Sequence, residues 1–224
     1  MFNLNTNLLE YKLILAQEKV EDKISEVIKV ALASNCTISV KSGKRNWIGS
    51  GFHLGEGYVG TASHVVPPEL MNSGAEITAT FDGKFMYPMN LLASNPNFDS
   101  AIIFNPDIPK AIPACKLGDS NTLNIGEIVA VISSPEGWHD TATVGRISNI
   151  HQSLGDPDKP AWNDIIFIDA DILQGSSGGM TIGTDGLVYG SIMGVTGQHA
   201  DIGIGQRAIC PSNKILSMLQ SLQK

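Results

Sequence analysis

Three residues whose types together catalyse acyl transfer occur in separate short segments of the chain. His64 ends the segment GSGFHLGEGYVGTASH, Asp99 closely precedes the apolar run AIIF, and Ser177 lies within LQGSSGGM. A serine hydroxyl attacks well only when a neighbouring base takes its proton, and histidine titrates near neutral pH. A carboxylate then fixes the imidazole tautomer and stabilises its cationic form. We therefore predict that His64, Asp99 and Ser177 form a nucleophilic triad.

The glycines around Ser177 suit the second requirement of this chemistry, an oxyanion hole. Backbone N–H groups must meet the oxyanion of a tetrahedral intermediate without rearranging, and glycine lets the backbone turn so that they converge. We expect Gly175 and Ser177 to donate the main hydrogen bonds and Ser176 to shape the loop. Each segment alone also has a simpler explanation, because an Asp before a strand is often a turn residue and GSSGG can be a flexible turn or an anion-binding nest.

The order of the three residues along the chain separates two kinds of serine hydrolase. GSSGG fits the G-x-S-x-G elbow of α/β-hydrolases, in which the serine precedes the acid and the histidine. His199 is the only histidine after Ser177, and no alternation of strands and helices is visible. The order His64, Asp99, Ser177 is instead the chymotrypsin order.

Short β-prone stretches separated by turns fill most of the chain. The 224 residues include 23 glycines and 11 prolines, as is typical of all-β proteins with many turns. The predicted strands are Thr37–Lys41, Trp47–Leu54, Tyr58–Ala62, Ala75–Phe81, Ala101–Phe104, Ile128–Ser133, Ala142–Ile150, Ile165–Ile172, Met180–Ile182 and Leu187–Val195. This series predicts an all-β, chymotrypsin-like double β-barrel with an N-terminal and a C-terminal helix.

Two helices are expected at the ends. Leu8–Ala31 carries one apolar stripe with a charged back, so this helix either packs on its own domain or mediates oligomerisation. At the other end Ser212 or Asn213 can cap a helix that turns Ile215, Leu219 and Leu222 inward. The expected division is a helix over 1–33 and a protease-like domain over 34–224, with barrels over roughly 34–115 and 116–210.

Composition excludes several classes of function. The net charge is −7 and no basic stripe is present, which argues against a nucleic-acid partner. The five histidines show no metal-ligand spacing, and acyl transfer by the triad needs no cofactor, so neither a metal nor a cofactor is expected. Three widely spaced cysteines, no leader-like N-terminus and no bilayer-length apolar run favour a cytoplasmic protein without a membrane span.

Longer segments resemble the protease domain of the HtrA (Deg) family. Residues 117–137 (LGDSNTLNIGEIVAVISSPEG) are similar to its LGDS-then-GxxVxAIGxP pattern, residues 141–150 (TATVGRISNI) to TVTxGIVS, and residues 203–213 (GIGQRAICPSN) to GIGFAIPS. The similarity covers roughly residues 25–222, in the right order. It concerns the protease domain only, without a PDZ domain. Ser176 and Met180 stand where the family usually has Asn and Pro.

This resemblance implies a fold and an activity. The expected structure is two six-stranded β-barrels with the active site in the cleft between them. The expected activity is that of an endopeptidase acting on unfolded or damaged polypeptides, often as a homotrimer. Glu136–Thr141 and Gly155–Asn163 are the expected movable loops. The alternatives are a catalytically silent binding or chaperone-like protein on the same scaffold, or an assembly protein.

Asp171 raises a question of specificity. It lies six positions before Ser177, where trypsin-like digestive enzymes place the carboxylate that binds Lys or Arg and where HtrA proteins usually have Ala. If its side chain enters the pocket, a basic residue before the scissile bond is favoured. If it forms an ion pair or is solvated at the rim, no such preference follows. The opposite wall of the pocket is expected from Ile192, Met193 and Gly194, with the strand backbone through Val195 pairing with substrate.

Overall fold

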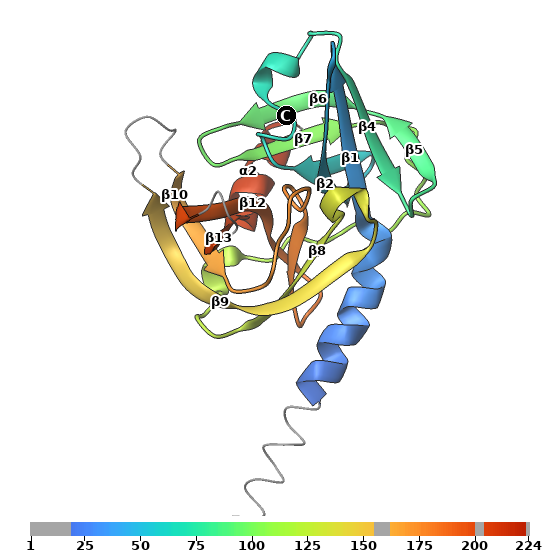
Figure 1. Ribbon diagram of the computed structural model, residues 1–224. Helices are drawn as coiled ribbons and strands as arrows, with labels where there is room; N and C mark the ends of the chain where they lie inside the picture. Colours follow the sequence, from blue (N-terminus) through green and yellow to red (C-terminus); the bar gives the residue numbers. More distant parts are fainter. Residues whose placement is uncertain (1–18, 155–161, 200–203, 223–224) are drawn as a thin grey trace, which may run out of the picture.

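Runs of β-branched and aromatic residues between glycine-containing turns form two β-sheets in the computed structural model of the chain (Figure 1). The structure describes residues 19–154, 162–199 and 204–222. The predicted all-β, chymotrypsin-like architecture with a helix near each end is confirmed. Residues 8–18 of the predicted N-terminal helix and 155–161 of the second predicted loop lie outside the described residues.

The first sheet has seven strands in the order β5-β4-β1-β2-β3-β7-β6. They are β1 (Asn35–Ser42), β2 (Arg45–Gly55), β3 (Tyr58–Thr61), β4 (Glu76–Phe81), β5 (Phe85–Pro88), β6 (Asn90–Asn95) and β7 (Ser100–Phe104). Only Met89 separates the two edge strands β5 and β6, and its N–H donates to Ile77. The two edges are thus consecutive pieces of one bent strand, and counting them together gives the six strands that the resemblance implies.

The second sheet is a closed barrel in the order β10-β13-β12-β11-β8-β9. Its strands are β8 (Ile128–Ser133), β9 (Thr141–Leu154), β10 (Trp162–Ile168), β11 (Met180–Gly183), β12 (Val188–His199) and β13 (Ile204–Pro211). β10 ends at Ile168, earlier than the predicted Ile172. The chain leaves the sheet there because the Asp169 side chain accepts the Arg146 N–H and Thr143 Oγ1 donates to the Asp171 carbonyl.

Helical segments close the fold at both ends. Residues 19–31 are helical and continue into η1 (Leu32–Ser34), and Ile24 on this helix is buried against the domain. α2 (Ser212–Leu222) packs against β7, β12 and β13, between the two sheets (Figure 1). Ile215 of α2 is fully buried, with Leu219 and Leu222 partly buried beside it, as the pattern predicted. Within the described ranges, no helix is long and apolar enough to cross a membrane.

One hydrophobic cluster joins the two sheets. It contains Phe52 and Ile102 from the first sheet and Ile132 and Met180 from the second. All four side chains are fully buried, and burying each large apolar side chain stabilises the fold by about 1.5–3 kcal/mol. Asp99 leads into β7, Ser177 leads into β11, and His64 follows β3, which pairs with β2 and β7. This cluster therefore fixes the two halves of the site relative to each other.

Candidate active site

His64 and Asp99 meet in the first sheet. His64 follows β3, and Asp99 occupies the turn that leads into β7, the neighbour of β3. His64 Nδ1 lies 2.8 Å from Asp99 Oδ2 and 3.0 Å from Oδ1, and the His64 backbone N–H donates to Oδ1 at 2.9 Å. The carboxylate therefore holds both the ring and the backbone of the same histidine.

Asp99 is buried and His64 is partly exposed, so the imidazole has one ring edge inside the protein and one toward solvent. The Asp99 side chain is 3% exposed and that of His64 is 48% exposed. A buried carboxylate accepts the Nδ1 proton, so the Nε2 lone pair faces the open side of the site. Asp99 has a positive φ of 51°, a conformation that Asp adopts more readily than most residues. In this turn Asp99 can adopt the positive φ that the backbone requires and can place its carboxylate against His64.

The loop that carries Ser177 is tied to the first sheet. The Ser50 N–H donates to the Ser177 carbonyl at 2.7 Å, and the Gly178 N–H donates to the Ile192 carbonyl at 2.8 Å. Gly178 has φ +83°, and a Cβ there would lie 2.3 Å from the Ser50 oxygen and 2.7 Å from the Ala62 nitrogen. Only glycine fits such a close approach. The loop accordingly packs against the chain two residues before His64.

No hydrogen bond joins Ser177 Oγ to His64 in the part of the chain that the structure describes. Such contacts are often long before substrate binds and tighten in the complex. The backbone contacts of Ser177 and Gly178, rather than a contact between the two side chains, bring the nucleophile loop and the histidine together.

Two backbone N–H groups beside Ser176 have no acceptor in the described part of the chain. Among the described residues, no protein acceptor takes the N–H of Gly175 or of Ser177. The Glu136 N–H donates to the Gln174 carbonyl at 2.9 Å, and in a trans peptide the following N–H, that of Gly175, points the opposite way. Ser50 Oγ donates to the Gly175 carbonyl at 2.7 Å. The Ser177 N–H shares its peptide with the Ser176 carbonyl, which accepts from the Gly179 N–H at 2.9 Å. The peptides of both unoccupied amides are therefore held through their carbonyl groups.

Ser176 supports the same loop from inside. Its side chain is buried, and its Oγ accepts from the Leu173 N–H and from Ser133 Oγ, both at 3.2 Å. Glu136, which holds the Gln174 carbonyl, belongs to the short helix η4 (Pro135–Gly137). The first predicted movable loop, Glu136–Thr141, is also tied to the first sheet, because His139 Nδ1 lies 2.8 Å from Thr37 Oγ1.

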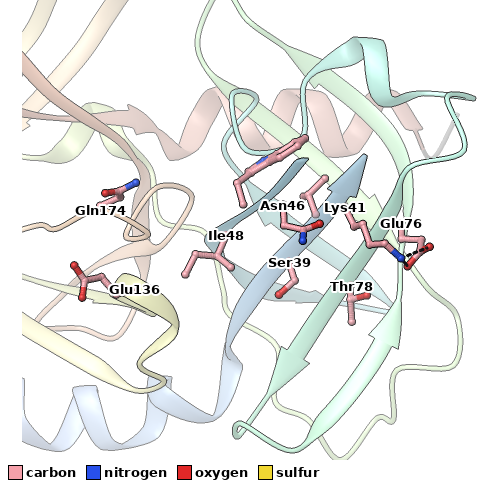
Figure 2. Close-up of a pocket in the computed structure, with 10 residues that line it drawn as sticks. Ser39, Lys41, Asn46, Ile48, Glu76, Thr78, Glu136 and Gln174 are labelled. Atoms are coloured by element: carbon pink, nitrogen blue, oxygen red, sulfur yellow. Dashed lines mark hydrogen bonds and ion pairs between the residues drawn. The ribbon is translucent and has the colours of Figure 1, made fainter. Parts of the chain in front are cut away.

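Two hollows flank the nucleophile loop. The first, here called the Glu136 groove, has a volume of about 650 Å³ and separates Glu136 and Gln174 from side chains of β1, β2 and β4. Figure 2 shows Ile48 between these two sides, with the Lys41–Glu76 ion pair (3.0 Å) at the far end. The second, the Asp171 pocket, has a volume of about 450 Å³ and is lined by residues that include Thr141, Thr143, Asp171, Leu173, Ser176 and Arg207.

The structure separates the residues predicted for the specificity pocket. Asp171 lines the pocket with its side chain 81% exposed, and it accepts from Arg207 Nη2 at 3.0 Å. Ile192 and Met193 are buried in two different clusters, because successive side chains of β12 point to opposite faces and both faces are covered. Gly194 follows with φ +148°. Only Asp171 of this set lines the Asp171 pocket.

Arg207, Ser50 and Glu136 are the neighbours of the site that sequence reasoning missed. Arg207 gives one signal in the sequence, a charge directly before the apolar segment AICP. Neither Ser50 nor Glu136 is distinguishable from an ordinary turn or strand residue in the sequence. Their roles depend on contacts made across more than 35 positions of the chain.

Comparison with known proteins agrees with this geometry. A family model described as a trypsin-like peptidase domain matches residues 49–190, a range that contains His64, Asp99 and Ser177. The chain belongs to the trypsin-like peptidase family.

Curated relatives of this family member are serine proteases of the DegP type. A probable periplasmic serine endoprotease, DegP-like, from Marinomonas sp. (strain MWYL1) is 33% identical over 155 residues, covering 67% of this chain and 30% of that protein. A probable periplasmic serine protease, do/HhoA-like, from Haemophilus influenzae is 27% identical over 186 residues, covering 80% of this chain and 38% of that protein. The chain thus spans about a third of these relatives' length, and the resemblance to HtrA proteases is confirmed.

The relatives also correct one prediction. They are named as periplasmic proteins, so the expectation of a cytoplasmic protein is wrong. That expectation rested partly on three unpaired cysteines. All three lie among the described residues and none forms a disulfide. Buried thiols fill space like small apolar side chains in either compartment, so they carry no information about it.

Solved structures show the same fold. The HtrA-type protease AlgW with a tripeptide superposes with a TM-score of 0.76 at 24% identity, covering 89% of this chain and 63% of that one. The active form of the Rv3671c protease from M. tuberculosis gives 0.72 at 24% identity, covering 87% and 82%. At this identity the likeness supports the fold, and the chemistry rests on the site itself.

Proposed function

We propose that the chain is a serine endopeptidase that cleaves extended polypeptide segments through an acyl-enzyme formed on Ser177. The observation that carries the proposal is the buried Asp99 carboxylate on His64 Nδ1, next to a loop with two unoccupied amides. Membership of the trypsin-like peptidase family supports the same conclusion. A scaffold that only binds other proteins has no need for this combination.

In the first step His64 acts as a base. Nε2 takes the proton of Ser177 Oγ as Oγ bonds to the scissile carbonyl carbon, and the carbonyl π electrons move to its oxygen. Asp99 stabilises the resulting imidazolium without taking its proton. The oxyanion is met by the N–H groups of Gly175 and Ser177, which are already oriented and need not reorganise.

In the second step the tetrahedral intermediate collapses. The C–N bond breaks as Nε2 gives its proton to the leaving amine, which leaves an ester between the acyl group and Ser177. Water then repeats both steps, with His64 again as base and then as acid. The product carboxylate departs and Ser177 regains its proton. No metal or cofactor takes part in this scheme.

The backbone next to Ser177 favours an extended substrate. β12 pairs with β11 only as far as Ser191, and Ile192 then exchanges hydrogen bonds with Gly178 and Gly179. From residue 193 to 195, the edge of β12 that faces away from β13 has no strand partner among the described residues. An extended peptide can add to such an edge. Unfolded or flexible segments supply this conformation, as the resemblance to HtrA proteases also implies.

The proposal does not include the oligomeric state, the location or the cleavage preference. The HtrA resemblance suggests a homotrimer, and the names of the relatives suggest a periplasmic location; both remain predictions. The preference for a basic residue expected from Asp171 is not carried forward, because Arg207 already pairs with that carboxylate.

Covalent labelling with a fluorophosphonate probe tests the proposal. The wild-type protein should be labelled, and Ser177→Ala should not. Ser73→Ala, which removes an exposed hydroxyl that bonds only to the backbone of its own turn, should be labelled like wild type. Half of the samples contain unfolded casein, whose cleavage is followed in parallel. Labelling only with casein would mean that substrate completes the oxyanion hole. An unlabelled wild type in both conditions would favour the silent binding protein instead.

A further inference from the structure

Three of the described residues that line the Glu136 groove are charged, namely Lys41, Glu76 and Glu136. Lys41 Nζ donates to both carboxylate oxygens of Glu76, at 3.0 Å and 3.2 Å, so these two charges offset each other. Figure 2 shows that pair at one end of the groove and Glu136 at the other. Among the residues whose structure is described, none forms an ion pair or a hydrogen bond with the Glu136 carboxylate. The end of the groove at Glu136 is therefore negatively charged.

We infer that Glu136 is a specificity-determining residue, which favours Arg or Lys among the first two residues after the scissile bond. The inference rests on the proposed function, because it assigns the Glu136 groove to the leaving half of the substrate. The recognised group is a guanidinium or an ammonium, to which a carboxylate makes charge-assisted hydrogen bonds. The preference concerns only the side of the scissile bond that departs as an amine.

Backbone contacts place the Glu136 groove beside the nucleophile. A Cβ at Gly175 would lie 2.7 Å from the Glu136 nitrogen, so Glu136 adjoins one of the two proposed oxyanion donors. A Cβ at Gly49 would lie 3.1 Å from the Ser177 oxygen. Ile48, which lies between the two sides of the groove in Figure 2, is the chain neighbour of Gly49. Both sides of the groove therefore begin at residues that touch the nucleophile loop.

The direction of the substrate assigns the groove to the leaving half. The acyl half is proposed to pair with residues 193–195 of β12, and the Gly178 N–H donates to Ile192 of that strand. On the side of the first sheet, the Ser50 N–H of β2 donates to the Ser177 carbonyl. A peptide that leaves β12 and passes over Ser177 therefore runs toward β2, whose residues 46–48 line the groove. Two extended residues span about 7 Å, so their side chains can enter it.

Glu136 combines a fixed backbone with a solvated carboxylate. Its N–H donates to the Gln174 carbonyl at 2.9 Å, and a Cβ at the next residue, Gly137, would lie 3.5 Å from Ile48 Cδ1. The segment is thus held on both sides, while Glu136 itself is exposed. Because water screens an exposed charge, a substrate cation gains what a surface ion pair gives. The expected preference is therefore modest and weakens as salt is added.

Partitioning of the acyl-enzyme tests the inference. One peptide ester forms the same acyl-enzyme in every assay, and an added dipeptide amide competes with water for it. The amine bonds to the acyl carbon as the bond to Ser177 Oγ breaks, and its proton returns to Ser177 through His64. The probes are Arg-Ala-amide and Ala-Arg-amide, each matched by the dipeptide in which neutral citrulline replaces Arg.

The wild type should form more aminolysis product with Arg than with citrulline, by about twofold to fivefold, in at least one of the two positions. Glu136→Gln should bring this ratio to about one, because the amide keeps the shape of the side chain and loses its charge. Glu136→Lys should reverse the ratio. Using ratios removes any general loss of activity.

Glu21→Gln is the matched control, because it makes the same change of charge at an exposed position of the N-terminal helical segment. It should leave the ratio of Arg to citrulline unchanged. In 1 M NaCl the wild-type ratio should fall toward one, because the Debye length shortens to about 3 Å. A wild-type ratio of one at both positions would overturn the inference, as would a preference for Arg that Glu136→Gln retains.

Failure of the proposed function would appear differently, as the absence of any acyl-enzyme on Ser177. Binding to Ser177→Ala then replaces partitioning, with peptides that cross the site and carry Arg or citrulline after the uncleaved bond. Tighter binding of the Arg peptides, lost when Glu136→Gln is added, would support the role of Glu136 without catalysis. Equal binding of the Arg and citrulline peptides would overturn it.

Discussion

Asp99 is the residue on which the proposed chemistry depends most closely, because it fixes which imidazole nitrogen carries a proton. Its carboxylate can only accept, so Nδ1 of His64 must donate and Nε2 remains a base. An amide at the same position could donate to Nδ1. The proton would then sit on Nε2, and the ring could no longer take one from Ser177.

Asp99→Asn should therefore lower kcat by about three to four orders of magnitude with little change in fold. The Asn oxygen can still accept the His64 N–H, and Asn tolerates the positive φ. Asp164→Asn is the matched control, because Asp164 Oδ1 lies 2.7 Å from His151 Nδ1 in an exposed pair elsewhere. Steady-state peptide cleavage and circular dichroism check both variants. Equal losses in the two would argue that charge alone, rather than the tautomer, matters.

Residue types and chain order were enough to propose His64, Asp99 and Ser177, because acyl transfer restricts the residue types and the order distinguishes the chymotrypsin arrangement from that of the α/β-hydrolases. The contact between Arg207 and Asp171 was not predictable in the same way. It depends on β13 lying beside the segment after β10, which brings together side chains 36 positions apart. The burial of both Ile192 and Met193 was not predictable for a related reason, because the sequence does not say which faces of a strand the neighbouring elements cover.

At the scale of elements, the nucleophile loop depends on β2 for its shape. Ser50 is fully buried, donates through Oγ to the Gly175 carbonyl at 2.7 Å and accepts the Ser134 N–H at 2.8 Å. One hydroxyl of the first sheet thus connects two loops of the second barrel. Because one of these loops contains both proposed oxyanion donors, the Ser50 hydroxyl contributes to the packing of the two halves and to the shape of the proposed oxyanion hole.

Ser50→Ala should destabilise the fold by about 1–3 kcal/mol, since it leaves a buried N–H and a buried carbonyl without a partner. Fluorophosphonate labelling should also slow, because the Gly175 carbonyl loses its donor. Ser73→Ala is the control: that hydroxyl also donates once and accepts once, from Ala75, but it is exposed. Its cost in urea denaturation should stay within about 0.5 kcal/mol. A Ser50 variant as stable as the Ser73 variant would contradict this account of the loop.

Several strands were predictable because their apolar runs are bounded by turns. Ile128–Ser133 was predicted with the bounds that β8 has, and β2 and β4 within two residues at each end. β5 and β6 were not predicted, since β5 is short and largely exposed and no residue of β6 is fully buried. β13 was visible only through the family resemblance. Its polar Gln206 and Arg207 interrupt the alternation that would mark a strand.

At the scale of the whole molecule, the three cysteines lie in different parts of the hydrophobic core. Cys36 is buried in the core of the first sheet, and Cys210 is buried in the cluster that joins the two sheets. Cys115 lies between β7 and β8, where its Sγ is 3.4 Å from Met180 Sδ. Burial raises the pKa of the Cys115 thiol to about 11 and raises the pKa values of Cys36 and Cys210 well above the ordinary value. All three are therefore held as neutral thiols.

These thiols should resist alkylation by iodoacetamide at pH 8 in the folded protein and react fully in denaturant, because the thiolate is the reactive form. The same shifts predict the pH dependence of stability. Above the ordinary pKa of about 8.5 the unfolded chain loses thiol protons that the folded chain keeps, so the free energy of unfolding falls as pH rises from about 8.5 toward 11. Urea midpoints at pH 8 and pH 10 measure this fall, and Cys115→Ala should reduce it. Mass spectrometry of the alkylated protein identifies which thiol reacts first. Modification of Cys115 alone would mean that the contact between the two sheets opens before the rest of the fold. Rapid modification of all three thiols at pH 8 would contradict the prediction.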